Sequence, residues 1–553
     1  MVAVGLIDPL ILKYIIDDIL TAGRVELLPL GILVFVFVKL VSVWIFSIYG
    51  VQYERFIQRI LFLLRQELYE RMQYKQYQFF KKRELGDLIK LLTSDVMQIR
   101  GLFSAGERFF ISGLKLIVIL SIVAWLNWQA LIILAVTIPF YALIQLSYIR
   151  KVKAQAIAMA ESDVRVMNFF SERLSNILLI KLFSQEAREL KRERKLTKQL
   201  SQTNVQLLRS IMSSIALIGT ISVLALAVLV WFAGQSVLMG AMTLGVLIAL
   251  YSYFLSLFEP VSALVSTPIS VQEIRASLIR LSDLLREKEE GAPKDAGSVR
   301  FEGEIVFENV SFAYPTAPKK LILDNVSFTI KPGERVAIAG QSGEGKSTIA
   351  LLLLRFFEPT KGKIWIDGVP VTVYSPHSLR SRIGFAPQNS MLFPGTVYEN
   401  VTYAMPTSRI KLTEVERAAE LAAIHDRIAR LPKGYQTIVG SSGGRLSEGE
   451  KQRVSLARVF LRDQDVYVFD EPTSALDKKN EEYIKQSIQQ VTEGHTTIII
   501  SHRVSTIDFA DRILLLENGR IAEEGSFRSL LRKRKKFYGL FSEQKRAQMP
   551  KES

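Results

Sequence analysis

Five long apolar runs constrain this chain of 553 residues more than any other feature. They cover residues 25–46, 111–128, 130–149, 211–232 and 243–264, and each holds at most two Asp, Glu, Lys or Arg side chains. Each run is long enough to cross the ~30 Å hydrocarbon layer of a membrane as a helix. A soluble all-α core is the alternative, but five runs of this length argue against it. The pattern predicts an α-helical membrane domain.

The first twenty residues, MVAVGLIDPLILKYIIDDIL, are apolar to about Tyr14, but Asp8 and Lys13 interrupt the run. The segment is therefore too short to span a membrane comfortably by itself. We expect it to be the outer half of a first span, whose other half is missing or is shorter than usual.

Long charged stretches at 53–100 and 150–200 separate the apolar runs and carry many lysines and arginines. The positive-inside rule assigns them to the cytoplasmic side of a plasma (inner) membrane. The net charge of +16 is then explained by contact with the lipid bilayer, and no nucleic-acid partner is expected. The chain has no cysteine, which excludes a disulfide scaffold, a zinc-thiolate site and a cysteine nucleophile.

The composition changes after Leu285. Residues 286–300 combine charge, glycine and proline without an apolar period, which is typical of a linker. Beyond it, short runs rich in valine and isoleucine alternate with helical patterns, as in EIVFENVSF, ERVAIAG and VYVFDEP. This alternation predicts a mostly parallel sheet with crossover helices. We therefore expect a membrane domain at 1–285, a linker at 286–300, an α/β domain at 301–540 and a polar tail at 541–553.

A glycine-rich loop follows one of these strands in RVAIAGQSGEGKSTIALLLL. It has the spacing of a phosphate-binding P-loop, G-x-x-x-x-G-K-S, between an apolar strand and an apolar helix. The backbone N–H groups of such a loop surround phosphates, a lysine adds a full cation, and a serine hydroxyl can coordinate Mg²⁺. The loop predicts ATP binding by Gly340, Gln341, Ser342, Gly343, Glu344, Gly345, Lys346, Ser347 and Thr348.

A second apolar strand, VYVFDEP, ends in Asp470 and Glu471. Carboxylates at the C-terminal end of a strand lie where ligands bind in α/β folds. Asp470 would hold Mg²⁺, largely through water, and Glu471 would act as general base on the attacking water.

Three single residues gain meaning from these two motifs. Gln388 could bind Mg²⁺ or the attacking water, and His502, which ends another apolar strand, could bond the γ-phosphate. Tyr314 could stack on adenine. A histidine after a strand is more often structural, and an aromatic residue in this position packs equally often in a core, so both alternatives stay open.

Together these features resemble an ATP-binding-cassette (ABC) transporter of the exporter type, with the membrane domain fused ahead of the nucleotide-binding domain. The resemblance covers nearly the whole chain. It implies about six spans, a unit of two chains, and two ATP molecules held between the two nucleotide-binding domains. The segments 86–100 and 172–186 look like cytoplasmic coupling segments. The SALD stretch, ending at Asp477, looks like the D-loop.

The signature segment departs from the family pattern Leu-Ser-Gly-Gly-Gln, since Ser447 is followed here by Glu448, Gly449 and Glu450. One interpretation is a well-capped helix, because S-x-x-E is a capping box. The other is electrostatic, because a carboxylate ~6 Å from a phosphate costs about 2–3 kcal/mol per charge pair at an effective dielectric near 20. The second interpretation favours pairing with a different half-transporter, a heterodimer, and a homodimer is the alternative.

The leading functional hypothesis is ATP-driven export or flipping of an amphipathic or hydrophobic substrate. A membrane-anchored ATP-gated channel or regulator is the second hypothesis, which the presence of Glu471 disfavours. An ATPase acting on nucleic acid is the third, and the spans disfavour it. Lys39, Lys115 and Glu259 lie within or near spans and are candidates to line a substrate cavity.

Overall fold

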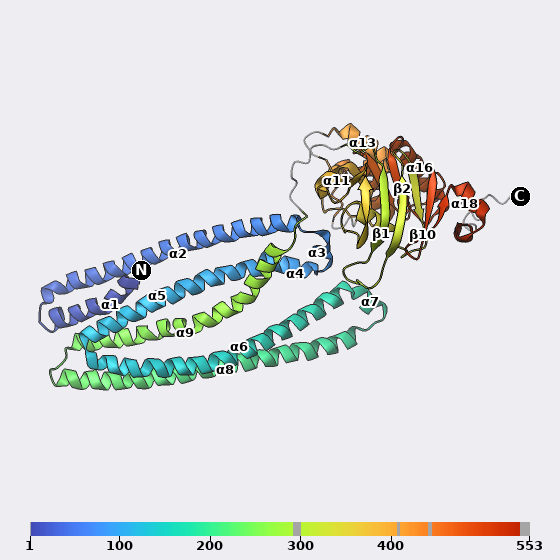
Figure 1. Cartoon of the computed structure of the whole chain (residues 1–553). Helices are drawn as coiled ribbons and strands as arrows, with labels where there is room; N and C mark the ends of the chain where they lie inside the picture. The colour runs from blue at the N-terminus through green and yellow to red at the C-terminus, as the bar shows by residue number, and fades with distance from the viewer. Residues whose placement is uncertain (1, 291–299, 406–409, 441–444, 542–553) are drawn as a thin grey trace. The chain divides into compact units, whose positions relative to one another are not determined.

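The computed structural model describes residues 2–290, 300–405, 410–440 and 445–541, and it separates into two compact units (Figure 1). Unit 1 contains Met1–Glu70 and Gly86–Arg286, and unit 2 contains Arg71–Leu85 and Glu287–Ser553. The break after Arg286 falls beside the expected linker, of which residues 291–299 lie outside the described residues. A short piece of the N-terminal half, Arg71–Leu85, groups with the C-terminal half.

Unit 1 is helical. Among the described residues, five helical segments are long and apolar enough to cross a membrane. The elements run in the order α1 (Val2–Tyr14), η1 (Ile15–Leu20), η2 (Val25–Leu27), α2 (Leu28–Gln73), α4 (Leu85–Lys90), η3 (Leu91–Asp95), α5 (Val96–Leu126), α6 (Trp128–Ser175), α7 (Ile177–Leu182), α8 (Glu186–Leu238) and α9 (Leu244–Arg286).

Helix α9 packs against α1, α5, α6 and α8, and its Tyr253 and Phe254 side chains are fully buried. The Tyr253 hydroxyl donates to the carbonyl of Leu6 at 2.6 Å, which fixes α1 against α9. Asp17, just after α1, accepts hydrogen bonds from the Thr243 hydroxyl at 2.6 Å and from Gly245 N at 2.8 Å. The short N-terminal helix is therefore held along its length by the start of α9.

Unit 2 contains two sheets. The larger has six strands in the order β10-β9-β3-β8-β7-β6 and is parallel except for the β9–β10 pair. Its strands are β3 (Arg335–Ala339), β6 (Ile383–Ala386), β7 (Val466–Asp470), β8 (Thr496–Ile500), β9 (Arg512–Glu517) and β10 (Arg520–Gly525). All five residues of β7 and of β8 are buried, as expected for the centre of a parallel sheet.

The smaller sheet is antiparallel, with strand order β2-β1-β4-β5. Its strands are β1 (Ile305–Phe312), β2 (Leu323–Ile330), β4 (Lys361–Ile366) and β5 (Val369–Pro370). The expectation that EIVFENVSF belongs to the parallel sheet is therefore wrong. Only ten residues separate β1 from β2, which suits an antiparallel pair, whereas a parallel pair needs a crossover of a dozen residues or more.

The helices of unit 2 after the linker are mostly short and surround the sheets (Figure 1). They are α10 (Lys346–Leu353), α11 (Pro376–Arg382), α12 (Val397–Thr402), α13 (Leu412–Leu421), α14 (His425–Ala429), η5 (Gly434–Gln436), α15 (Glu448–Phe460), α16 (Lys478–Val491), α17 (Val504–Ile507) and α18 (Phe527–Lys533).

Residues 74–75 and 287–290 of unit 2 form a small clasp. Glu290 N donates to the Tyr74 carbonyl at 2.7 Å, and Lys75 and Glu289 form an antiparallel bridge. The Lys75 side chain is fully buried, and its Nζ donates to the Glu287 carbonyl at 2.6 Å and to Glu289 Oε1 at 3.1 Å. The turn that follows α2 is thus tied to the segment that follows α9.

The clasp is anchored on the domain that carries the sheets. Glu290 accepts two hydrogen bonds from Arg380, at 2.7 and 3.1 Å. The Arg380 guanidinium lies 4.1 Å from the centre of the Phe356 ring, which in turn lies 5.1 Å from the ring of Tyr77 in α3 (Tyr77–Lys81). Helix α3 therefore belongs to unit 2, whereas residues 86–100, expected to be the first coupling segment, belong to unit 1.

The clasp can be tested by cross-linking, because the chain contains no other cysteine. Partners in an antiparallel bridge have Cα atoms about 4.5–5.5 Å apart, which a disulfide can span. We expect the K75C/E289C variant to form an intrachain disulfide under mild oxidation, measured by mass spectrometry after thiol blocking. In the control variant K75C/K288C, the second side chain points to the opposite face of the segment and should react more slowly. Equal yields in the two variants would contradict the clasp.

Candidate nucleotide-binding site

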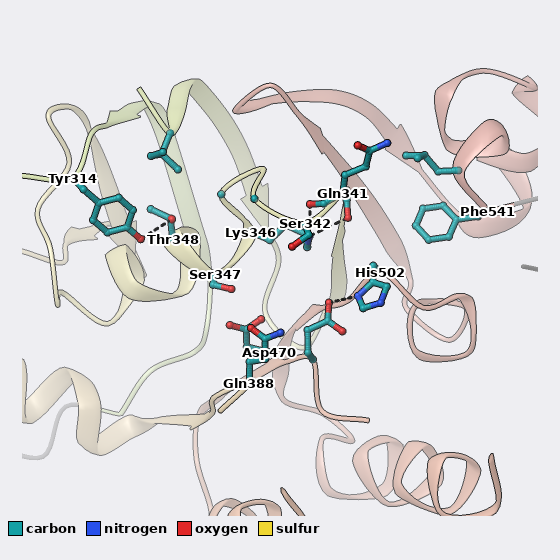
Figure 2. Close-up of a pocket in the computed structure, with 16 residues that line it drawn as sticks. Tyr314, Gln341, Ser342, Lys346, Ser347, Thr348, Gln388, Asp470, His502 and Phe541 are labelled. Atoms are coloured by element: carbon teal, nitrogen blue, oxygen red, sulfur yellow. Dashed lines mark hydrogen bonds and ion pairs between the residues drawn. The ribbon is translucent and has the colours of Figure 1, made fainter. Parts of the chain in front are cut away.

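A cavity of about 540 Å³ opens at the C-terminal ends of β3, β7 and β8. Figure 2 shows the residues of the two sequence motifs converging on it. The cavity is lined by Tyr314, Ile322, Gly340, Gln341, Ser342, Gly343, Gly345, Lys346, Ser347, Thr348, Gln388, Asp470, Glu471, His502, Leu540 and Phe541. Residues from seven separate places in the sequence thus share one site.

One predicted loop residue does not line this cavity. The Glu344 carboxylate accepts a hydrogen bond from the backbone N–H of Asn518, beside the loop. Its side chain therefore braces the loop from outside, and only its backbone belongs to the loop that faces the cavity.

The glycine loop connects β3 to α10. Gly340 has a φ of 155°, and a Cβ at this position would lie 2.4 Å from the Leu516 carbonyl oxygen, so only glycine fits the start of the loop. Lys346 begins α10, and its Nζ donates to the carbonyls of Gly340 at 2.9 Å and Gln341 at 2.7 Å. Burial lowers the pKa of Lys346, while the nearby Glu471 and Asp470 carboxylates act in the opposite direction. A mostly buried ammonium group is thus held at the loop mouth.

Asp470 and Glu471 lie side by side at the end of β7, with exposed fractions of only 4% and 5%. Burial raises the pKa of Asp470, and the Ser347 hydroxyl partly opposes the rise. Asp470 Oδ1 and Glu471 Oε2 are buried and have no hydrogen-bond partner within the described part of the chain. Two buried acceptors that face a cavity indicate that a ligand or water completes the site.

Oxygen donors for a metal also converge here. Ser347, Gln388 and Asp470 line the same cavity, and their hydroxyl, amide and carboxylate oxygens are ligands that Mg²⁺ prefers. The unpartnered Oδ1 of Asp470 fits such an ion.

Glu471 is oriented by His502. The His502 Nδ1 lies 2.6 Å from Glu471 Oε1 (Figure 2). Glu471 also adopts a φ of 53°, a left-handed conformation that costs free energy for a residue with a side chain. Its backbone N–H donates to the Ile500 carbonyl at 2.8 Å, so the sheet supports this conformation. The surrounding structure therefore holds one carboxylate oxygen against His502, and the other oxygen faces the cavity.

Tyr314 packs in the core and also borders the cavity. Its ring packs edge-on against Phe312 at 5.0 Å and Phe357 at 5.3 Å, as a core residue does. It also lines the cavity, and its hydroxyl lies 2.9 Å from the Thr348 hydroxyl.

The signature segment forms the start of α15. Ser447 caps this helix, and the reciprocal hydrogen bonds with Glu450 of a capping box are both present. Arg427 Nε donates to Glu450 Oε1 at 2.6 Å. Burial pushes the pKa of Glu450 upward, but the Ser447 N–H and the Arg427 guanidinium outweigh burial and hold the pKa below its usual range. Glu450 is thus an ionised helix cap with its own counter-charge.

Glu448 differs from Glu450, because its side chain is 75% exposed and, among the described residues, pairs only with Lys451 one helical turn later, at 2.7 Å. Gly449, between them, approaches the D-loop closely, since a Cβ there would lie 2.7 Å from the Ala475 carbonyl oxygen. Asp477 caps α16 and so ends the D-loop. Of the two glutamates, Glu448 is the one whose charge faces outward.

Sequence reasoning missed two sets of residues. Gln452, only 4% exposed, donates to the Glu471 carbonyl at 2.8 Å and accepts from Ala475 N at 3.1 Å. It thereby links the signature helix to the turn after β7. Leu540 and Phe541 also line the cavity, and Figure 2 shows Phe541 on the side opposite Tyr314. Phe541 is buried in a core cluster, one residue beyond the boundary expected at 540.

Two family patterns match the chain. The pattern for the ABC transporter transmembrane region matches residues 2–261, and that for the ABC transporter matches residues 323–474. The putative multidrug export ATP-binding/permease protein YgaD of Bacillus subtilis (strain 168) is 30% identical over 97% of this chain and 93% of its own length. The chain belongs to the ABC transporter family.

Two further comparisons define the type of ABC transporter. The ATP-dependent lipid A-core flippase of Syntrophus aciditrophicus (strain SB) is 31% identical over 96% of this chain and 88% of its own length. The solved structure of a bacterial Atm1-family ABC exporter with ATP bound matches this chain with a TM-score of 0.84 and 28% sequence identity. The match covers 100% of this chain and 98% of the exporter chain.

This ABC transporter is therefore an exporter-type half-transporter, an integral membrane protein with an N-terminal membrane region and a cytoplasmic domain that binds and hydrolyses ATP to drive export. Half-transporters of this kind work as dimers.

The buried Asp470 carboxylate gives a stability prediction. Its raised pKa means that the folded chain binds this proton more tightly than the unfolded chain, so the free energy of unfolding falls as pH rises through the folded pKa. D470N should therefore raise the melting temperature of the nucleotide-free protein at pH 7.5 by about 2–4 °C. It should also lose the extra stabilisation that Mg²⁺ and ATP give the unaltered protein.

Thermal unfolding in detergent measures both effects. D463N is the matched control, because Asp463 lies just before the same strand with an 89% exposed side chain. A fall in melting temperature for D470N, or an equal rise for D463N, would contradict the role given to burial.

Proposed function

We propose that the ATP site of this exporter works with Glu471 as general base, His502 as the residue that positions Glu471, and Lys346 with the loop N–H groups as the phosphate cradle. The observation that carries the proposal is the position of the Glu471 carboxylate. Its Oε1 contacts His502 Nδ1, and its Oε2 is buried in the cavity without a hydrogen-bond partner among the described residues. A carboxylate held in this way can accept a proton from water that attacks a phosphoryl group.

The remaining residues have supporting roles in this proposal. Tyr314 stacks on the adenine, and Gln388 with Ser347 and Asp470 holds Mg²⁺. When bound, this ion would neutralise negative charge on the ATP phosphates. Asp477 belongs to the D-loop that faces the second chain.

E471Q tests the general base. An amide of the same shape cannot accept the proton, so ATP turnover should fall at least 100-fold while ATP binding stays within about threefold. Phosphate release measures turnover, and a fluorescent ATP analogue measures binding. H502A should retain more turnover than E471Q, because it removes only the positioning contact. Near-normal turnover of E471Q would refute the assignment.

For the partner, we favour a heterodimer. In a dimer of half-transporters, the signature segment of one chain acts on ATP bound to the other. The ion pair with Arg427 offsets the charge of Glu450, whereas the exposed Glu448 would still repel the partner's ATP. A second half-transporter with an uncharged signature would give the ATP site at this chain's own P-loop a competent partner, while the site served by Glu448 would turn over slowly. A homodimer with two slow sites is the alternative.

E448G tests this arrangement. In chain purified without a partner, removing one carboxylate should raise ATP turnover about tenfold, a change of about 1.4 kcal/mol in the barrier. E450Q is the matched control and should give a smaller gain, because Arg427 already offsets that charge. If the unaltered chain alone turns over ATP at ordinary transporter rates and E448G gives no gain, the heterodimer proposal fails.

For the substrate, we propose an amphipathic or hydrophobic molecule. The chain is similar to a putative multidrug export protein and to an ATP-dependent lipid A-core flippase, and the second name specifies an amphipathic lipid.

A further inference from the structure

Helix α9 is the most buried of the five candidate spans among the described residues, yet one row of its side chains is exposed. Tyr251, Leu255 and Glu259 follow one another at four-residue spacing, which places them in a row along one side of the helix. Tyr251 is 41% and Leu255 50% exposed, and the Glu259 side chain is 81% exposed. The row therefore changes from apolar to acidic along the helix.

Glu259 lies within the depth of the membrane. It follows Leu244, at the outer end of α9, by fifteen residues, or about 22 Å at 1.5 Å per residue. Lys115 precedes Leu126, at the outer end of α5, by eleven residues, or about 17 Å. Both depths fall inside a hydrocarbon layer of ~30 Å, with Lys115 near its middle and Glu259 in its cytoplasmic half.

The two side chains form an ion pair between α5 and α9, with Lys115 Nζ 2.5 Å from Glu259 Oε2. The pair is unequal, because the lysine side chain is 25% exposed and the glutamate side chain 81% exposed. The pair therefore presents mainly the carboxylate. A carboxylate that faced lipid tails would be costly, so this face borders a space that holds water or a polar group.

More polar groups continue at the same level. Ser262 lies three residues after Glu259, and its hydroxyl accepts a hydrogen bond from Gln145 Nε2 of α6 at 2.8 Å. Gln145 Oε1 is buried and has no partner within the described residues. Gln145 follows Trp128, at the outer end of α6, by seventeen residues, or about 26 Å. Polar side chains of α5, α9 and α6 therefore form a layer, the polar level, in the cytoplasmic half of the membrane.

We propose that this row is a binding site for an amphipathic cation, with its ammonium group at Glu259 and its apolar part along Leu255 and Tyr251. The inference rests on the proposed function, because it names the substrate class of the exporter. The orientation is that of an amphiphile in the cytoplasmic leaflet, with its charged end at the polar level and its tail toward the membrane centre. Lys115 fixes the position of the Glu259 carboxylate.

A second intramembrane ion pair provides a comparison. Lys39 of α2 pairs with Asp8 of α1, and here the lysine is the more exposed member, at 49% against 14%. Lys39 follows Leu28 by eleven residues, so it lies at a depth similar to that of Lys115. This pair presents a cation and should not attract another one.

The experiment measures binding without ATP, so it does not depend on turnover. The full chain in nanodiscs of phosphatidylcholine is titrated with an alkyl-tailed fluorescent quaternary ammonium dye, and with a sulfonate dye that has the same tail. Fluorescence anisotropy reports the dissociation constants. We expect the unaltered chain to bind the cationic dye at least tenfold more tightly than the anionic dye.

Three variants separate the explanations. E259Q should remove the preference for the cation, and K39Q should leave it unchanged. K115E/E259K retains an ion pair at the same place but presents the lysine, so it should reverse the preference. A preference that survives both E259Q and the exchange would overturn the proposal. So would a change of oligomeric state in E259Q with unchanged dye affinity, because the face would then be a contact with a second copy.

ATP turnover of the same samples is measured separately. If the dye preference follows Glu259 but turnover does not respond to the dye, the binding site stands and the proposed export of this substrate class fails. If the preference does not follow Glu259 while turnover is normal, the exporter stands and this site fails.

Discussion

The ATP site depends on the burial of three charged groups at the C-terminal ends of parallel strands. Asp470, Glu471 and Lys346 are each less than 9% exposed. Burying one charge alone is costly, and burying opposite charges together is tolerated only when hydrogen bonds and nearby charges complete the set. Here the set is incomplete, because two carboxylate oxygens lack partners in the described structure. The cavity is therefore arranged to be completed by a ligand with its own charges, as a nucleotide phosphate with a metal ion would be.

This arrangement extends from the nucleotide to the contact with the second chain. Gln452 joins the Glu471 carbonyl to the signature helix, and Gly449 lies against the backbone of Ala475. A shift of the turn after β7 on nucleotide binding would displace the signature helix of the same chain. If that helix acts on the other chain's ATP, as we propose, each chain could report the state of its own site to its partner.

The local motifs of the site could be predicted from the sequence, and the long-range contacts could not. The P-loop and the Asp470–Glu471 strand are short patterns in which neighbouring residues share one task, so their position in the cavity followed from their spacing. Gln452 and Phe541 act through residues far away in the chain, and no local pattern distinguishes them from ordinary helix residues. The antiparallel sheet was missed for the same reason, because a strand's apolar pattern does not say which strand pairs with it. The position of the Glu344 side chain, outside the cavity, could not be predicted because a loop motif specifies the backbone and leaves its exposed side chains free.

The same consideration changes how the two signature glutamates should be understood. By spacing alone, Glu448 and Glu450 would repel a phosphate equally, but their surroundings in the fold differ. Glu450 is a helix cap whose charge is offset by Arg427, a residue twenty-three positions earlier in the chain. Glu448 pairs with the neighbouring Lys451, and such surface pairs at helical spacing stabilise by only a few tenths of a kcal/mol. In the heterodimer that we propose, the electrostatic handicap of this signature would therefore be one charge and not two. A handicap of that size would slow a site without abolishing nucleotide binding, which is the condition under which a dimer with unequal sites could still close around two ATP molecules.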